Sequence, residues 1–231
     1  MNLVEFKNVN KSYGKKLALD DVSFSIKKGK IVGLLGPNGS GKTTIIKLIN
    51  DLLVEDNGSI LIEENKPGID TKKKVAYLPE RTYLNMNVKV TDLLKYFEDF
   101  YDDFDINKAT ELLKKLNIDG NDKLKTMSKG TKEKVQLILV MSRKADLYVL
   151  DEPIGGVDPA GRDYILETIL TNFNEDSSLL ISTHLISDIE NILDDVIFIK
   201  NGKIVLNENA ENIREKTGKT IDSLFREEFK C

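Results

Sequence analysis

The chain has 231 residues, of which 40% are hydrophobic and 31% charged, a balance typical of a globular protein that buries a sizeable core. Its net charge of −4 gives no support to a nucleic-acid-binding protein, which would usually be basic. Cys231 is the only cysteine, so an intramolecular disulfide is excluded and a reducing compartment is expected. The sequence starts without the apolar core of a signal peptide, and none of its apolar runs approaches the roughly 18 residues that span a bilayer.

The first two predicted strands, residues 3–9 and 18–26, are joined by a turn around Gly14. In the second strand, apolar residues alternate with serines, which is typical of a half-buried strand. Tyr13 stands in the connection. Considered alone, its ring is expected to pack on this hairpin more readily than to stack on a base.

Residues 31–44 carry the most specific motif. Five mostly apolar residues predict a buried strand, then Gly-Pro-Asn-Gly-Ser-Gly-Lys-Thr-Thr has the spacing of a phosphate-binding loop, and apolar residues at helical spacing follow. Glycines let backbone N–H groups approach a nucleotide's β-phosphate, and the helix adds the positive end of its dipole. Lys42 would lie between the β- and γ-phosphates, and the Thr43 hydroxyl would bind Mg²⁺. We expect the whole phosphate loop to contact nucleotide, namely Gly36, Pro37, Asn38, Gly39, Ser40, Gly41, Lys42, Thr43 and Thr44.

Residues 59–62 and 75–78 predict short strands, and Glu80 follows the second one. Residues 81–125 show helical periodicity with acidic runs, which predicts an insert of two or more helices. For the aromatic side chains of this insert, core packing is favoured over a ligand site, and contact of some of them with a partner stays open. These aromatic residues are Tyr96, Phe97, Phe100, Tyr101 and Phe104.

A helix is predicted over residues 132–141, preceded by the segment 127–131, Met-Ser-Lys-Gly-Thr. Ser128 is a good N-cap, and Gly130 leaves the backbone bare at the start of the helix. By itself this pattern indicates a capped helix and no more.

Residues 147–150 form a fully apolar strand that ends at Asp151 and Glu152. Such strands are typical of parallel sheets, whose ligands bind at the carboxyl ends of the strands. Beside a phosphate loop, the pair predicts that Asp151 holds Mg²⁺, usually through water, and that Glu152 polarises the attacking water. The weaker alternative is a helix-capping pair before Pro153.

A tight turn at residues 155–159 precedes a helix predicted over 160–172, and an apolar strand over 178–183 follows. His184, the only histidine, comes directly after that strand, so it is expected at the sheet edge of Glu152, where it could contact a γ-phosphate. An Asn-Gly turn predicts a hairpin of residues 196–199 and 203–206. The charged, partly helical residues 210–230 are expected to form an exposed tail.

In this order and at these spacings, the motifs over residues 1 to about 208 resemble the ATP-binding subunit of an ABC transporter. Residues 127–131 are similar to the family's signature loop, His184 to its switch histidine and residues 156–158 to the loop that touches the opposite subunit. The resemblance implies that Tyr13 stacks on adenine, and that Asp158 contributes to the nucleotide interface.

The fold implied is α/β: a phosphate-loop NTPase core with a mixed sheet, flanking helices and an N-terminal antiparallel β subdomain, plus an inserted helical subdomain. As one domain over 1–231, it would divide into a core of residues 1–80 and 146–208, a helical subdomain of residues 81–145 with the signature loop, and a tail of residues 209–231.

Two departures from the family pattern are visible. Glu80 stands where the family often has Gln, and a carboxylate there can still bind Mg²⁺. Lys129 and Thr131 replace Gly and Gln in the signature loop, whereas Ser128 and Gly130, which would face the phosphate, remain. Ser-Lys-Gly loops and Leu-Pro-Glu segments also resemble the branch that contains antibiotic-resistance and other export-type bacterial systems.

The activity implied is ATP hydrolysis that powers transport, with export favoured. Two subunits, as homodimer or heterodimer, would sandwich two Mg-ATP head to tail, each between Lys42 of one subunit and Ser128 and Gly130 of the other. A separate polytopic permease would hold the cytoplasmic chain at the inner face of the cell membrane. No nucleic-acid partner is expected.

Two other functions are weighed against this one. The alternative of a soluble ABC-type ATPase acting on nucleic acid or ribosomes is disfavoured by the single domain and the net acidity. A regulatory module that binds ATP without turnover is disfavoured because Lys42, Asp151, Glu152 and His184 are all present.

Overall fold

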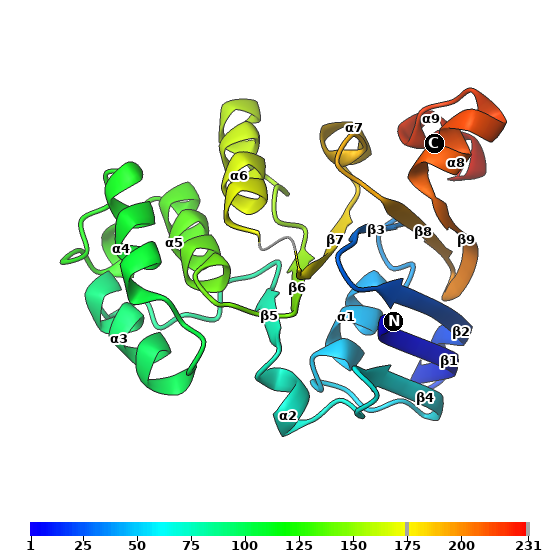
Figure 1. The fold of residues 1–231 in the computed structure, drawn as a ribbon, viewed down its shortest axis with the longest axis horizontal. Coiled ribbons are helices and arrows are strands. Elements are labelled where there is room, and N and C mark those ends of the chain that lie inside the picture. Colours follow the sequence, from blue (N-terminus) through cyan, green and yellow to red (C-terminus); the bar gives the residue numbers. More distant parts are fainter. Residues whose placement is uncertain (174–175, 230–231) are drawn as a thin grey trace.

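Two β-sheets and a helical region make up the computed structural model, which describes residues 1–173 and 176–229 (Figure 1). The central sheet of these residues has six strands in the order β5-β6-β7-β3-β8-β9. Its strands are β3 (Ile31–Leu35), β5 (Val75–Leu78), β6 (Leu147–Asp151), β7 (Ser178–Thr183), β8 (Asp195–Lys200) and β9 (Lys203–Asn209). Every neighbouring pair is parallel except β8 and β9, so the predicted mixed sheet is confirmed.

The N-terminal antiparallel sheet is also confirmed, with the order β2-β1-β4. Its strands are β1 (Asn2–Tyr13), β2 (Lys16–Lys27) and β4 (Asn57–Ile62). The first two are longer than residues 3–9 and 18–26, because the ladder continues through several register shifts to the pair Tyr13 and Lys16. Apolar side chains of this sheet, of α1 (Lys42–Ile49) and of the central strands share one hydrophobic cluster, which fixes the phosphate loop between the two sheets.

The helical region lies at the opposite end of the molecule from the antiparallel sheet (Figure 1). It contains α3 (Val90–Phe100), α4 (Ile106–Lys115), a 3₁₀ turn (Leu124–Thr126) and α5 (Lys129–Met141). These elements share a hydrophobic cluster of their own. Its aromatic residues divide: Phe97 and Phe104 are buried in the cluster, whereas Tyr96 and Phe100 are 59% and 65% exposed. Core packing therefore explains only part of the aromatic set.

The remaining helices are α2 (Ile69–Lys72), α6 (Pro159–Asn172), α7 (Ile186–Ile189), α8 (Ala210–Thr217) and α9 (Ile221–Phe229). The prediction of an exposed tail is wrong for residues 210–229. Ile213, Ile221 and Phe225 are buried, and the Phe225 ring lies 5.5 Å from that of Phe198 on β8. The charged residues face outward, while a few apolar ones seal this end of the core. Cys231 lies outside the described residues.

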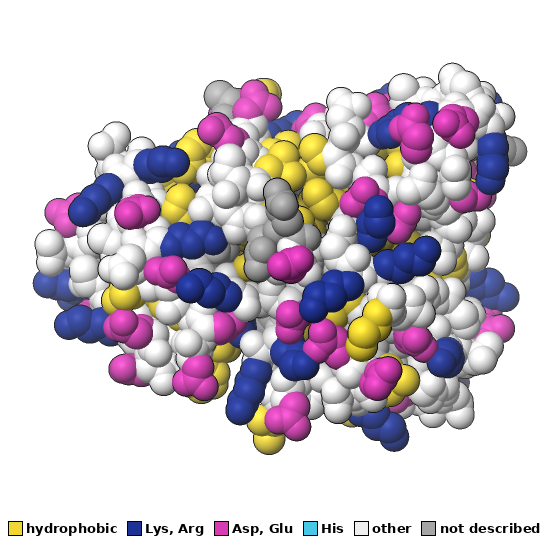
Figure 2. Space-filling model, in the orientation of Figure 1, with side chains coloured by type: hydrophobic (Ala, Val, Ile, Leu, Met, Phe, Trp, Pro, Cys, Tyr) yellow, Lys and Arg dark blue, Asp and Glu magenta, His cyan; other side chains and the backbone are white. Residues whose placement is uncertain are grey.

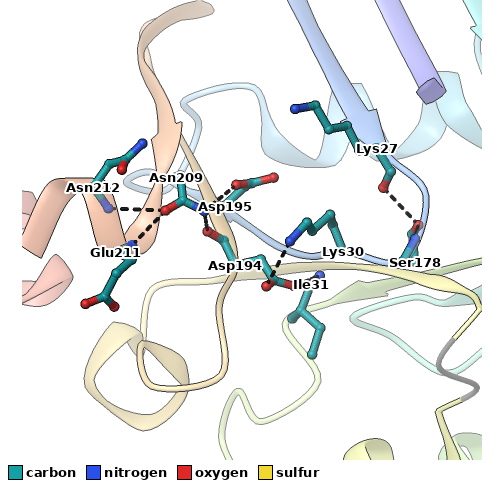
Figure 3. Close-up of polar contacts among 10 residues, drawn as sticks. Lys27, Lys30, Ile31, Ser178, Asp194, Asp195, Asn209, Glu211 and Asn212 are labelled. Atoms are coloured by element: carbon teal, nitrogen blue, oxygen red, sulfur yellow. Dashed lines mark hydrogen bonds and ion pairs between the residues drawn. The ribbon is translucent and has the colours of Figure 1, made fainter. Parts of the chain in front are cut away.

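Polar contacts fasten the amino-terminal ends of the central strands (Figure 3). The carboxylate of Asp194 accepts a hydrogen bond from the backbone N–H of Ile31 at 2.9 Å and lies 3.3 Å from the ammonium of Lys30. The Asn209 amide donates to the Asp194 carbonyl at 2.8 Å, and Ser178 Oγ donates to the Lys27 carbonyl at 3.1 Å. The carboxyl ends of the strands, at the other edge, are left to the loops that carry the candidate site.

Among the residues that the structure describes, there is no helix with both the length and the apolar character needed to cross a membrane.

Candidate functional site

The carboxyl ends of three adjacent parallel strands bring the predicted chemical groups together. The phosphate loop follows β3, Asp151 ends β6 with Glu152 next to it, and His184 follows β7. The register pairs Asp151 with Ser182, which brings the ends of these strands level. The sheet therefore brings these residues together as the sequence pattern predicted, because the carboxyl ends of neighbouring parallel strands lie at the same end of the sheet.

The phosphate loop has a backbone that requires glycine. Gly39 and Gly41 have φ of +79° and +121°, values that L side chains rarely adopt. A Cβ on Gly36 would lie 2.4 Å from the Ile199 carbonyl oxygen, so the loop packs too closely against β8 for any larger residue. Lys42 begins α1, and its ammonium donates to the Gly36 carbonyl at 2.7 Å.

One buried hydroxyl packs inside this loop. Ser40 is 2% exposed, and its Oγ has no partner among the described residues. A buried hydroxyl without a partner costs free energy, which a hydrogen bond would recover. This hydroxyl lies on the Gly36 side of the loop, 2.6 Å from where a Gly36 Cβ would stand. The glycine backbone of the loop and the Lys42 ammonium are what fit it to the phosphates of a nucleotide.

The oxygen donors expected for Mg²⁺ line one cavity. Thr43, Glu80 and Asp151 all face it. Among the described residues, no group of three or more His, Cys, Asp or Glu side chains could hold a metal alone. Mg²⁺ is usually held by one or two carboxylates together with substrate phosphates and water. The donor set therefore fits Mg²⁺ that arrives with a nucleotide.

Burial sets the electrostatics of the two central charges. Asp151 is 3% exposed, and desolvation raises the pKa of its carboxyl above the usual value, against a 2.6 Å hydrogen bond from Ser182 Oγ that lowers it. Desolvation likewise lowers the pKa of the Lys42 ammonium, and the carboxylates of Glu152, Asp151 and Glu80 oppose this shift. The site therefore pairs a buried cation with carboxylates, an arrangement ready for a charged ligand.

Glu152 and His184 form a pair at the mouth of the site. Glu152 Oε2 lies 2.9 Å from His184 Nδ1. The backbone of Glu152 is in the left-handed region, with φ of +51°, and is held there because its N–H donates to the Ser182 carbonyl at 2.9 Å. A strained glutamate at the end of a catalytic strand is the kind of outlier that accompanies function.

A cavity of about 910 Å³ joins the phosphate loop to the first turns of α5. The predicted residues that line it are Tyr13, Asn38, Gly39, Gly41, Lys42, Thr43, Thr44, Glu80, Asp151, Glu152 and His184. The predicted residues outside its lining are Gly36, Pro37, Ser40, Ser128, Gly130 and Asp158.

Several polar residues of this cavity escaped sequence reasoning: Lys16, Arg81, Thr82, Lys132, Glu133 and Gln136. Those on α5, together with Lys129, recur at i, i+3, i+4 and i+7, which is one face of a helix. That spacing could have predicted a polar helix face toward the site. Arg81 and Thr82, which follow Glu80, show no such pattern.

Ser128 of the signature loop and Asp158 cap helices and do not line this cavity, whereas Lys129 of the same loop does line it. Ser128 Oγ accepts from the Thr131 N–H at 3.1 Å, so α5 begins at Lys129, three residues before the predicted start. The Asp158 carboxylate accepts from the Gly161 N–H at 3.0 Å and caps α6. Ser128, Gly130 and Asp158 are all exposed.

The family model described as ABC transporter matches residues 19–155, more than half of the chain. The chain belongs to the ABC transporter family.

Two bacterial ABC transporter subunits are similar over nearly their whole length. The lantibiotic transport ATP-binding protein SrtF of Streptococcus pyogenes is 32% identical over 92% of this chain and 95% of its own. The SkfA peptide export ATP-binding protein SkfE of Bacillus subtilis is 33% identical over 89% and 88%. A solved structure of the ATP-binding subunit of an ABC transporter superposes with a TM-score of 0.88, at 27% identity over 97% and 98% of the two chains.

The predicted family, fold and enzyme class are thereby confirmed. This ABC transporter subunit binds ATP and hydrolyses it to power transport. These matches give no support to the alternative of an ATPase that acts on nucleic acid or ribosomes. On the face shown in Figure 2, acidic and basic side chains are interspersed, without a broad basic patch of the kind that binds nucleic acid.

Proposed function

We propose that this chain powers an exporter in which each Mg-ATP is cleaved between two subunits. One observation carries the proposal: Glu152, paired with His184, lines the same cavity as Lys42, whereas Ser128 and Gly130 of the signature loop are exposed and do not line it. An exposed helix N-terminus whose Ser128 and Gly130 lie outside the cavity of their own chain is free to meet the nucleotide of a second subunit.

The residue roles follow from this geometry. Lys42 and the phosphate loop hold the β- and γ-phosphates, and Tyr13, which is 46% exposed at the cavity, stacks on the adenine. Thr43, Glu80 and Asp151 would hold Mg²⁺, which would supply neutralising charge at the phosphates. Glu152 takes a proton from the attacking water, and His184 orients Glu152 and contacts the γ-phosphate.

The second subunit completes each site. In a head-to-tail pair, Ser128 and Gly130 approach the γ-phosphate held by the partner, and Asp158 lies at the interface. Their exposure supports this arrangement. A core of residues 1–80 and 146–208 would carry the chemistry, and the helical subdomain of residues 81–145 would carry the signature loop. The pair is a homodimer or a heterodimer with a second ATP-binding subunit.

The transmembrane partner is a separate polytopic permease, which would hold this chain at the cytoplasmic face of the cell membrane. The names of the relatives, lantibiotic transport and peptide export, support export of a peptide or related antibiotic. A third relative, the linearmycin resistance ATP-binding protein LnrL of Bacillus subtilis, is 30% identical over 88% of this chain and agrees with that direction.

The Glu152→Gln variant tests the catalytic role. Without a general base, we expect hydrolysis to fall at least about 100-fold, while ATP still binds and drives dimerisation, measured by light scattering. Glu215→Gln, an exposed change on α8, is the control and should hydrolyse ATP at the parental rate. Full activity in the Glu152→Gln chain would remove Glu152 from the mechanism.

Affinity capture of the tagged chain from detergent-solubilised membranes tests the partners. A polytopic protein in stoichiometric yield supports the proposal, and the number of ATP-binding chains recovered decides between homodimer and heterodimer. Recovery with ribosomes or nucleic acid, and without a membrane protein, would overturn it.

A further inference from the structure

One buried arginine joins the helical region to the central sheet. Arg143 is 4% exposed and follows the last turn of α5. Its Nη1 donates to the Val75 carbonyl and its Nη2 to the Lys73 carbonyl, each at 2.7 Å, where β5 begins. Its Nε donates to the Asp103 carboxylate, in the connection between α3 and α4, at 3.0 Å. The guanidinium carbon lies 3.9 Å from the centre of the Tyr101 ring.

These contacts use both the several N–H donors and the flat face of the Arg143 guanidinium. β5 is an edge strand of the central sheet, so its outward carbonyls have no neighbouring strand to bind. The planar fork of Arg143 donates to one of those carbonyls, that of Val75, to the Lys73 carbonyl just before the strand, and to Asp103, and it stacks on Tyr101. Backbone bonds between Lys144 N and Asp103 O, and between Asp105 N and Ser142 O, run beside it at 3.0 and 2.8 Å.

A second contact fastens the other end of the same strand. Gln136, on α5 and 4% exposed, donates from Nε2 to the Pro79 carbonyl at 3.2 Å. Pro79 immediately precedes Glu80, which faces the nucleotide cavity. α5 is therefore attached to β5 at both ends, by Arg143 at the start of the strand and by Gln136 beyond its end.

This attachment has a mechanical consequence. Ser128 caps the other end of α5, about 22 Å from Arg143 at 1.5 Å per residue. A tilt of α5 by about 10° over this length would move Ser128 by about 4 Å. Displacements of about 1 Å in a catalytic constellation can lower rates about 100-fold.

We propose that Arg143 is a positioning residue for ATP hydrolysis. It holds α5 and β5 as one unit, so that the signature loop and the Glu80 loop keep a fixed separation when two subunits close on ATP. The inference rests on the two-subunit arrangement proposed above. Since Arg143 does not line the nucleotide cavity, we expect a substitution of Arg143 to leave nucleotide binding by the phosphate loop unchanged.

Three variants test this role. Arg143→Lys keeps the charge and loses the fork, and Asp103→Asn removes the charged partner in the helical region. Arg214→Lys is the matched control, because Arg214 also donates to a backbone carbonyl, that of Glu190 at 2.5 Å, but belongs to α8 and touches neither α5 nor β5. For each variant we would measure melting temperature, ADP affinity, kcat and KM for ATP, and ATP-driven dimerisation in the Glu152→Gln background.

We expect ADP affinity within twofold of the parent in all three variants. In Arg143→Lys, kcat should fall at least tenfold and dimerisation should weaken at least tenfold, and Asp103→Asn should shift both in the same direction. Arg214→Lys should keep both. The inference is wrong if Arg143→Lys keeps kcat. It is also wrong if Arg214→Lys loses as much melting temperature as Arg143→Lys and loses as much kcat, because the loss of kcat would then follow from lower stability alone. Failure of the Glu152→Gln parent to dimerise would overturn the two-subunit proposal instead, and the split between kcat and ADP affinity would still decide on Arg143.

Discussion

At the scale of single residues, the buried Asp151 carboxylate works against the stability of the free chain. It is 3% exposed and shares its surroundings with the carboxylates of Glu152 and Glu80. Its raised pKa means that the folded chain binds this proton more tightly than the unfolded chain. The favourable contribution of protonated Asp151 is therefore present below the usual pKa of 3.8 and is lost as pH rises through the folded-state value.

We therefore predict that Asp151→Asn stabilises the chain free of metal and nucleotide by about 1 kcal/mol at neutral pH, a gain typical of relieved active-site strain. The advantage over the parent should shrink as pH falls toward 4, because the parental carboxyl then becomes neutral too. Urea unfolding in EDTA from pH 4 to 8 measures this, and Mg²⁺-dependent hydrolysis should be lost. A variant less stable than the parent at every pH would contradict the argument.

Sequence reasoning reached those site residues that lie in fixed-spacing motifs or end an apolar strand, such as Lys42, Glu152 and His184. It did not reach Ser182, whose hydroxyl binds Asp151. Ser182 lies within a predicted strand, and only the register of β6 against β7 puts it opposite that carboxylate. The contacts of Gln136 and Arg143 were missed for a similar reason, because their partners lie 40 or more residues away in the sequence.

At the scale of elements, the start of α5 combines two tasks in one side chain. Ser128 caps the helix now and is proposed to meet a phosphate in the two-subunit state. We predict that Ser128→Ala costs about 1 kcal/mol of stability, as loss of an N-cap does, and also lowers hydrolysis. Asp105→Ala, which removes the cap of α4, should cost a similar amount and keep hydrolysis. Chemical denaturation measures the capping task, and steady-state ATPase rates measure the contact with phosphate. If Ser128→Ala and Asp105→Ala changed the ATPase rate equally, the phosphate contact of Ser128 would be refuted.

The C-terminal helices show where composition misleads. Residues 210–229 are mostly polar, but their few apolar side chains fall on the buried face of two short helices. Such short amphipathic segments carry a weak periodic signal, and their packing depends on a β8 surface that no local pattern reveals. We predict that Phe225→Ala costs about 3 kcal/mol in urea unfolding, because it empties a buried aromatic site. A change below about 1 kcal/mol would mean that these helices do not seal the core.

At the scale of the whole molecule, ligand binding should stabilise everything that depends on the phosphate loop. The loop lies between two sheets, so nucleotide binding requires both to be folded. We predict that Mg-ADP at about 100 times its Kd stabilises the chain by about 2.7 kcal/mol, seen as a higher melting temperature. Lys42→Ala should abolish this shift. An equal shift in that variant would mean that nucleotide binds elsewhere.

The mixed sheet and the antiparallel sheet were predictable from the resemblance to the family, because the motifs that carry it, such as the phosphate loop, have local signatures. The order of strands in the sheet was not. It depends on β3 lying between β7 and β8, whose register partners are 148 residues away for Ile31 with Leu179 and 163 residues away for Val32 with Asp195.

The position of β3 between β7 and β8 also constrains when the protein can fold during its synthesis. On the ribosome, the phosphate-loop motif emerges early. Its strand, β3, has its two neighbours β7 and β8 available only after β8 (Asp195–Lys200) has been synthesised. Contacts between segments so distant in sequence form late, because closing long loops is slow. The Ile199 carbonyl that packs against Gly36, and the Gly202 N–H that donates to the Ser40 carbonyl at 2.8 Å, are synthesised only after β7 and most of β8. Nascent chains with an intact motif would thus be unable to hold ATP, and the first bound nucleotide would mark the moment at which synthesis has passed β8 and the central sheet has closed.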